Sequence, residues 1–204
     1  MFDPFMLLNI LEFRSLLLDS PSVLDVGCGN DSPVQYLGIH DCTGIDGYQP
    51  ALDAAQKAKT HHKFVIGDIR NLTSVFPKKS FDACIALDVI EHLSKEDGFR
   101  LIESMESVAR KRVIFLTPNG FLPQRHQSRG DMQEHLSGWS AKEMTQRGFK
   151  VIGMLGPKGL RGEFHRIKRT PRFFWGLVSL FQQLSSTRQD PKSAAAILCW
   201  KDLK

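Results

Sequence analysis

The sequence predicts a doubly wound α/β fold, with a mostly parallel sheet and helices on both of its faces. Short apolar runs alternate along the chain with segments whose apolar residues have helical spacing. The apolar runs are continuous, which is typical of strands that helices bury on both faces. The first run leads directly into a glycine-rich turn, Gly27-Cys28-Gly29-Asn30. Ligands of such sheets bind beyond the carboxyl ends of the strands, so we expect a site at this turn.

Strands and helices account for most of the chain. The expected strands are 23–26, 42–46, 64–68, 81–88, 112–117, 149–155 and 194–200. Helices are expected over 32–37, 50–57, 95–109 and 141–147, and a polar loop over 119–133. Ser94, with Asp97 three residues later, has the spacing of a helix N-terminus.

The composition is that of a folded chain. Its 204 residues, of which 42% are hydrophobic, predict a single domain over 1–204. Residues 1–20 lack a basic start and a cleavage site, which predicts an amphipathic N-terminal helix instead of a signal peptide. No apolar run is long enough to span a bilayer, so we expect a cytoplasmic protein. The cysteines lack CxxC spacing and are interpreted as small buried thiols: Cys28, Cys42, Cys84 and Cys199.

The charge is unevenly distributed. Residues 157–204 contain ten Lys/Arg and three Asp/Glu, whereas residues 1–156 contain 17 and 19. The net charge of +5 therefore belongs to the C-terminal part. Such a distribution fits an RNA enzyme, an enzyme at a membrane surface, or one with an anionic substrate.

The glycine turn and a later carboxylate predict a nucleoside-binding corner. Gly27 and Gly29 permit close approach of the backbone to a ligand. Asp46 follows the second strand, 17 positions after Gly29, and an ionised carboxylate can accept both hydroxyls of a ribose. Ser32 stands where a dinucleotide fingerprint has its third glycine, and Asp31 disfavours an anion in the turn. A cationic or zwitterionic nucleoside is therefore favoured over a dinucleotide.

In these segments the chain resembles the class I S-adenosylmethionine-dependent methyltransferases, in their small-molecule, type 11-like branch. Residues 23–30 resemble the first motif, and 67–69 the turn whose Asp binds adenine. Residues 87–93, Leu-Asp-Val-Ile-Glu-His-Leu, are similar to the segment after the fourth strand. The resemblance covers about 20–155. It implies a seven-stranded Rossmann-like sheet with an antiparallel last strand, S-adenosylmethionine as cofactor and S-adenosylhomocysteine as product.

The resemblance also implies roles for individual residues. Asp25 would lie near the amino-acid end of the cofactor, Asp46 would hold the ribose, and Asp68 with Ile69 the adenine. The expected cofactor set is Asp25, Gly27, Cys28, Gly29, Asp46, Gly47, Asp68, Ile69 and Asp88. The alternatives are an ordinary tight turn for the glycines, turn-capping roles for Asp46 and Asp68, and a backbone-bonded strand end for Asp25.

Two histidines are the expected catalytic residues. Methyl transfer from a sulfonium requires alignment and exclusion of water, and an oxygen or nitrogen acceptor also needs a base. His92 follows the fourth strand, near the place expected for the methyl group. His135 opens a His-Leu-Ser-Gly-Trp segment that resembles one in a subset of the superfamily. His126 and Asp131, in the same loop, are further candidate bases.

Some of these residues have other interpretations. Glu91 and His92 can tie their loop to a helix. In some relatives a similar Glu-x-x-Glu-His arrangement holds a divalent metal, with Asp88 here at the first acidic position; the prediction is nevertheless no metal site. His135 can be a helix-entry residue, and Trp139 is expected to pack in the core and not to stack on an acceptor.

Residues 157–192 form a basic amphipathic insertion before the last strand. Thr170-Pro171 is expected to open a helix, with Thr as the cap. One face of this helix is apolar, with Phe173, Leu177, Leu180, Phe181 and Leu184. Peripheral membrane contact through 166–184, a lid or dimer face, and a plain helix covering the sheet edge all remain open.

The resulting hypothesis is a methyltransferase acting on a small or medium acceptor, most simply an oxygen of a sugar, a lipid-linked intermediate or a secondary metabolite. The alternatives are an RNA methyltransferase, a cofactor-binding partner subunit without catalysis, and a nicotinamide oxidoreductase. Nucleic acid is the less favoured acceptor because residues 1–156 are near neutral. The segment after the fourth strand also lacks the Asn-Pro-Pro-Tyr-like run of enzymes that methylate exocyclic amines of bases.

Overall fold

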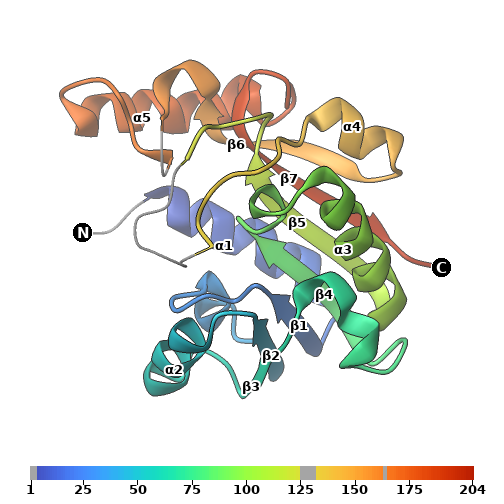
Figure 1. Cartoon of the computed structure of the whole chain (residues 1–204). Coiled ribbons are helices and arrows are strands. Elements are labelled where there is room, and N and C mark those ends of the chain that lie inside the picture. The colour runs from blue at the N-terminus through green and yellow to red at the C-terminus, as the bar shows by residue number, and fades with distance from the viewer. Residues whose placement is uncertain (1–3, 125–131, 163–164) are drawn as a thin grey trace.

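Seven strands form one sheet in the computed structural model, in the order β3-β2-β1-β4-β5-β7-β6 (Figure 1). The structure describes residues 4–124, 132–162 and 165–204. The strands are β1 Ser22–Val26, β2 Asp41–Asp46, β3 Lys63–Ile66, β4 Phe81–Leu87, β5 Ala109–Pro118, β6 Lys150–Pro157 and β7 Ala194–Asp202. The α-helices are α1 Pro4–Leu17, α2 Gln49–Ala58, α3 Lys95–Val108, α4 Ala141–Gln146 and α5 Arg172–Gln182. Short 3-10 helices are η1 Pro33–Tyr36, η2 Ile69–Ser74, η3 Ile90–His92 and η4 Lys158–Leu160, and a π-helical turn, η6 Gln183–Thr187, extends α5.

The strand directions confirm the predicted Rossmann-like sheet. The pairs β3–β2, β2–β1, β1–β4 and β4–β5 are parallel, whereas β7 runs antiparallel to both β5 and β6. The chain moves outward from β1 to β2 and β3, and then returns to place β4 on the other side of β1. The carboxyl ends of β1, β2 and β4 therefore meet where the strand order reverses, which is where such sheets bind ligands.

Alternate residues of the strands bury on opposite faces of the sheet. In β1, Leu24 and Val26 belong to the core on the side of α3 and α4, whereas Val23 belongs to the core that contains Phe13 and Leu17. Because side chains of a strand alternate between faces, one apolar run serves both cores. Figure 1 shows α3 and α1 on opposite sides of the sheet, as the two cores require.

Trp139 packs in the core, as the sequence predicts. Its side chain is fully buried, and Nε1 donates to Ser137 Oγ at 2.9 Å and to the Ile90 carbonyl at 3.3 Å. The ring lies against α3, where Gly98 provides the space: a Cβ built there lies 3.1 Å from Cη2 of Trp139 and closer still to Cζ2. Ring contacts with Phe99 and Lys95 complete the enclosure.

Several local predictions are confirmed and others need correction. Ser94 caps α3 by accepting from Asp97 N at 3.1 Å, and the four cysteines are free and buried. The expected helix over 32–37 is only the 3-10 turn η1, and the third strand ends at Ile66, before Gly67 and Asp68. Thr170 does not cap α5, because that helix begins at Arg172 with Pro171 in the cap position and no side-chain cap bond.

The helices of the described part of the chain include none with the length and apolarity needed to cross a bilayer. The N-terminal helix expected over 1–20 is present as α1 over Pro4–Leu17. The division of the chain into one domain over 1–204 stays a prediction.

The contact between Gly98 and Trp139 gives a stability test. Gly98→Ala should lower the free energy of unfolding by about 1–3 kcal/mol, because the added methyl group overpacks a buried ring. The higher helix propensity of Ala offsets at most about 1 kcal/mol of this loss in the free energy of unfolding. Urea denaturation followed by circular dichroism measures the change. Gly159→Ala, where an added Cβ meets no atom within 4 Å, is the control and should stay within about 0.5 kcal/mol. Equal stability of the two variants would contradict the packing described.

Candidate functional site

The glycine turn after β1 is fixed to the end of β2 by backbone hydrogen bonds. Gly27 N and Cys28 N donate to the Ile45 carbonyl at 2.8 and 3.1 Å. Gly27 has φ +69°, and a Cβ there would lie 2.7 Å from Val89 Cγ2, so only glycine fits. Gly29, with φ +57°, would place a Cβ in open space, with no atom within 4 Å. The turn is thus closed on the side of Val89 and open at Gly29.

Asp46 joins this turn to the chain that follows β2. Its Oδ2 accepts from Gly29 N at 2.9 Å, and its Oδ1 accepts from Tyr48 N at 2.8 Å. The carboxylate therefore has the turn-capping role that the sequence left open. An ionised carboxylate offers about four lone-pair positions, so two remain for a ligand. Both a structural and a ligand-binding role are compatible with this geometry.

Asp25 is held from within the protein. The residue is only 1% exposed. Its Oδ2 accepts from Ser32 Oγ at 2.5 Å and contacts His61 Nε2 at 2.9 Å. His61 Nδ1 in turn contacts Thr60 Oγ1 at 2.8 Å. Ser32, which replaces the third glycine of the dinucleotide fingerprint, thus anchors the turn to the end of β1. His61 comes from the segment before β3, and no local pattern in the sequence indicates that it reaches Asp25.

Most of the expected cofactor residues line one cavity of about 770 Å³. It lies at the carboxyl ends of β1, β2 and β4, and the 132–136 segment forms its other side. The expected residues that line it are Gly27, Gly29, Asp46, Gly47, Asp68, Ile69, Asp88 and His92. Asp25, Cys28 and His135 are not among the lining residues. The Cys28 side chain is buried against Gly44, and burial, with Asp25 and Asp46 nearby, raises the pKa of its thiol.

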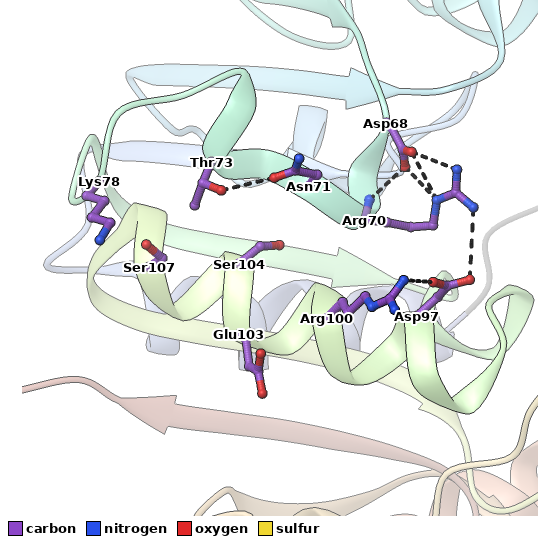
Figure 2. A pocket seen from close by; sticks show the side chains of 10 residues that line it. All are labelled: Asp68, Arg70, Asn71, Thr73, Lys78, Asp97, Arg100, Glu103, Ser104 and Ser107. Carbon is purple, nitrogen blue, oxygen red and sulfur yellow. Dashed lines mark hydrogen bonds and ion pairs between the residues drawn. The ribbon is translucent and has the colours of Figure 1, made fainter.

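Asp68 lies between this cavity and a second one of about 760 Å³ between η2 and α3 (Figure 2). Arg70 donates from Nε and Nη2 to both carboxylate oxygens of Asp68 at 2.7–3.0 Å, and this pairing lowers the pKa of Asp68. In the second cavity Asp97 pairs with Arg70 at 3.9 Å and with Arg100 at 3.4 Å. The charges there neutralise one another within the protein, so we assign no ligand to it.

Glu91 is a buried acid next to His92, which lines the first cavity. It is 2% exposed; Oε2 accepts from Thr117 Oγ1 at 2.9 Å, and Oε1 has no hydrogen-bond partner among the described residues. Burial and the nearby Asp88 raise its pKa well above the usual range. Its backbone carbonyl accepts from Leu136 N and Ser137 N. Glu91 therefore ties its turn to β5 and to the 134–139 segment, and not to a helix.

Two imidazoles face this carboxyl group. His92 Nδ1 lies 3.1 Å from the Glu134 carbonyl, and His135 Nδ1 lies 2.6 Å from the Leu122 carbonyl. A carbonyl oxygen only accepts, so both Nδ1 atoms carry the proton and both Nε2 atoms keep a lone pair. The rings meet edge to face with centroids 4.8 Å apart. Burial lowers the pKa of His135, against the hydrogen bond to Leu122, which raises it.

The sequence matches the family described as Methyltransferase domain over residues 24–117. That stretch contains the glycine turn, Asp46, Asp68 and the Glu91–His92 pair. This match and the Rossmann-like fold support a class I S-adenosylmethionine-dependent methyltransferase. None of the curated proteins matches this methyltransferase.

Solved structures share the fold of this methyltransferase at low identity. An S-adenosylmethionine-dependent methyltransferase from Archaeoglobus fulgidus is 14% identical with a TM-score of 0.62, over 97% of this chain and 94% of that one. The methyltransferase domain of a bacterial Hen1 is 17% identical with a TM-score of 0.59, over 96% and 97% of the two chains. The plantazolicin methyltransferase BamL, solved with a triazolic desmethylPZN analog and SAH, is 17% identical with a TM-score of 0.58, over 98% and 84%.

In the methyltransferase, Glu91, His92 and His135 have a geometry that fits a divalent cation. One ligand atom from each residue lies within 4.8 Å of the others, and the orphan Oε1 of Glu91 is a buried atom that needs a partner. A carboxylate and two imidazoles suit first-row transition metals better than Mg²⁺. Both Nδ1–H groups are already oriented by carbonyl oxygens, as in known metal-binding histidines. Bound there, a cation would act as a Lewis acid on an acceptor oxygen. The sequence predicts no metal site, and that prediction needs a direct measurement.

Asp88 and His165 form the rim of the same region. Asp88 adopts φ +54° directly after β4, and its half-exposed carboxylate lines the cavity. His165, from the basic segment before α5, places Nε2 3.5 Å from Asp88 Oδ1, and its Nδ1 is buried without a partner among the described residues. The sequence did not single out His165, because nothing local indicates that this segment reaches β4. The other candidate bases, His126 and Asp131, lie outside the described residues.

Metal binding can be measured without enzyme activity. If the cluster holds a cation, the protein should remove about one Mn²⁺ per chain from solution, seen as loss of the six-line electron paramagnetic resonance signal of the free ion. Glu91→Gln keeps the shape of the side chain and an acceptor for Thr117 but cannot lose a proton to become an anionic ligand, and should weaken binding at least tenfold. His40→Ala, which removes an exposed histidine elsewhere, should bind as the unchanged protein does. No uptake of Mn²⁺, or equal uptake by Glu91→Gln, would exclude this set of ligands.

Proposed function

We propose that this methyltransferase binds S-adenosylmethionine in the cavity at the ends of β1 and β2 and transfers the methyl group to an oxygen of a small or medium acceptor. The observation that carries the proposal is that Gly29, Asp46, Asp68 and His92 line one cavity. These residues are separated in the sequence and come from the ends of three different strands and from the turn after the fourth.

Each part of the cofactor has residues suited to hold it. Asp46 has free lone pairs for ribose hydroxyls, and Asp68 with Ile69 borders the place for adenine. The open side of Gly29 allows the amino-acid part to approach the backbone. Asp25 and Cys28 contribute through the turn that they support, since their side chains are directed into the protein. Asp31 in the turn disfavours a pyrophosphate, and Ser32 stands in place of the third glycine, which supports a single nucleoside over a dinucleotide.

His92 and His135 supply the base for a hydroxyl acceptor. His92 lines the cavity, and without a bound cation its Nε2 lone pair can take the proton that the acceptor oxygen loses, either directly or with His135, whose ring lies against it. The neighbouring walls are apolar, with Val89, Leu93 and Leu136, and so reduce the water around the reacting atoms. A sugar, a lipid-linked intermediate or a secondary metabolite fits this environment. BamL, which shares the fold, is the plantazolicin methyltransferase and was solved with a triazolic desmethylPZN analog, which supports a small or medium acceptor.

The acceptor is tested by transfer of a tritiated methyl group. The purified enzyme is incubated with labelled S-adenosylmethionine and separately with cell-extracted polar metabolites, extracted lipids and total RNA. Label should enter the metabolite or lipid fraction and be base-stable, as an ether is. Label only in RNA would replace the proposal by the RNA methyltransferase alternative. Binding of S-adenosylmethionine without any transfer would favour a non-catalytic partner subunit. The predicted cytoplasmic location is tested separately by cell fractionation.

Asp46 gives a test of cofactor binding. Asp46→Ala should weaken S-adenosylhomocysteine binding at least tenfold in calorimetry, because it removes the ribose acceptors and releases Gly29 N. Asp53→Ala removes an exposed carboxylate of α2 that bonds only Gln49 among the described residues, and should leave the affinity unchanged. Unaltered affinity of Asp46→Ala would place the nucleoside elsewhere.

His135 gives a test by pH. Since burial lowers its pKa below the usual 6.5, the imidazole is neutral at and somewhat below that pH, and kcat/KM should fall only at lower pH. The free energy of unfolding should also fall at low pH. The folded protein loses stability as the pH falls through 6.5, because His135 binds a proton more readily in the unfolded chain. In His135→Gln the acid limb should shift or vanish and the rate fall about 100-fold. An identical profile and rate for His135→Gln would remove His135 from the reaction.

A further inference from the structure

The helix α5 turns its polar face toward the sheet. Ser179, Gln183 and Thr187, spaced four residues apart, are buried along α5 and the π-helical turn η6 that extends it. The hydroxyl of Ser179 donates to a backbone carbonyl of β6 at 3.1 Å. Gly153 and Gly156 of β6 lack the side chains that would collide with Thr187 and Ser179, so the helix packs closely on the strand. The inward face is therefore mainly small and polar, and Leu180 is the apolar residue of α5 that packs against the core.

The outward face of the same helix is apolar and aromatic. At 100° per residue its exposed members fall within about one third of the circumference of a helix. They are Phe173 (79% exposed), Phe174 (54%), Leu177 (46%), Phe181 (71%) and Leu184 (60%). A helix that merely covers a sheet edge buries its apolar stripe, and α5 does the opposite. Figure 1 shows α5 at the periphery of the molecule. The exposed fractions indicate that the described part of the chain leaves this face largely uncovered.

Exposed cations precede the aromatic stripe in the sequence, whereas Arg188 after it pairs with Glu12. Residues 164–189 include five Lys/Arg and no Asp/Glu. Lys168, Arg169 and Arg172 are exposed just before Phe173. The guanidinium of Arg169 lies 4.6 Å from the ring centre of Trp175, so the basic and aromatic groups form one surface. Basic residues beside an outward aromatic face are characteristic of helices that lie in the interface of an anionic bilayer.

Charge complementarity decides which occupant fits this surface. A second copy of the chain, packed through the same helix, would bring no carboxylate from 164–189 to these cations. An anionic lipid surface supplies both an apolar layer for the phenylalanines and phosphates for Lys168, Arg169 and Arg172. We propose that α5 docks this protein onto anionic membrane surfaces, with Phe173, Phe174, Leu177, Phe181 and Leu184 entering the acyl boundary.

Docking through α5 also places the acceptor region beside the lipid. β6 is parallel to β5 in the sheet, since both run antiparallel to β7, and α5 follows β6 at the carboxyl edge where the cavity opens. The connection between them carries His165, which reaches Asp88 at the cavity. This arrangement favours a membrane-borne acceptor, such as a lipid or a lipid-linked intermediate, over a freely dissolved one. That conclusion rests on the proposed function.

Vesicle co-sedimentation tests the docking itself. The protein is mixed with vesicles of 70% phosphatidylcholine and 30% phosphatidylglycerol, and with vesicles of phosphatidylcholine alone. Binding should be at least tenfold stronger to the anionic vesicles. It should weaken when NaCl is raised from about 50 to about 500 mM, because salt screens the attraction between the cations and the lipid phosphates. The double variant Phe173→Ser/Phe181→Ser should lose at least tenfold in affinity. Leu18→Ser, which replaces a residue 84% exposed after α1, is the matched control and should bind normally.

The controls separate docking from folding and from methyl transfer. Circular dichroism and the calorimetric affinity for S-adenosylhomocysteine should be the same in the double variant and the unchanged protein, because neither phenylalanine lies in the cavity. Sedimentation that is equal for both vesicle types, or unaffected by the double variant, would overturn the proposal. The proposal would also be overturned if the protein bound no vesicles and light scattering showed a dimer that the double variant dissociates. Failure to bind S-adenosylhomocysteine would instead overturn the proposed function and leave the docking result standing.

A second variant tests the electrostatic part. Lys168→Glu/Arg169→Glu/Arg172→Glu changes exposed side chains only, and should abolish the preference for anionic vesicles while leaving the cavity intact. Retained preference for phosphatidylglycerol in this variant would contradict the assignment of these cations to lipid phosphates.

Discussion

The site depends on one carboxylate that bridges two backbone amides. Asp46 accepts from Gly29 N and Tyr48 N, and so fixes the turn after β1 to the turn after β2. Two loops that could otherwise move apart become one corner with a free backbone edge at Gly29. A charge-assisted hydrogen bond of this kind is worth about 1.5–3 kcal/mol. The same oxygens are suited to the hydroxyls of a ribose, so in the function that we propose Asp46 both forms the corner and recognises the ligand.

The corner is supported from inside the protein. Asp25, buried at the end of β1, holds Ser32 and His61, and both of these lie behind the turn and not in the cavity. Ser32 explains how the turn dispenses with a third glycine: its hydroxyl makes a bond that a glycine cannot make. The surroundings of His92 follow the same principle, because Glu91 holds β5 through Thr117 and leaves one oxygen for the region that His92 and His135 share.

The sequence predicted the sheet and the corner because both depend on local signals. Continuous apolar runs and a glycine turn are read from neighbouring residues, and Asp46 lies at a fixed distance from the turn. His61, His165 and the orphan oxygen of Glu91 could not be predicted, since they depend on which distant segments meet. The apolar stripe of α5 was visible in the sequence, but periodicity does not reveal which face meets the sheet. Only the close approach at Gly153 and Gly156 determines that the polar face is buried.

A crystal structure of the protein with S-adenosylhomocysteine is the most direct test of the central claim. The account predicts ribose hydroxyls on the Asp46 carboxylate, the adenine beside Ile69 and the homocysteine along Gly29, with the Gly29–Asp46 hydrogen bond retained. A nucleoside bound elsewhere, or an Asp46 side chain that turns away from both the ligand and Gly29, would contradict it.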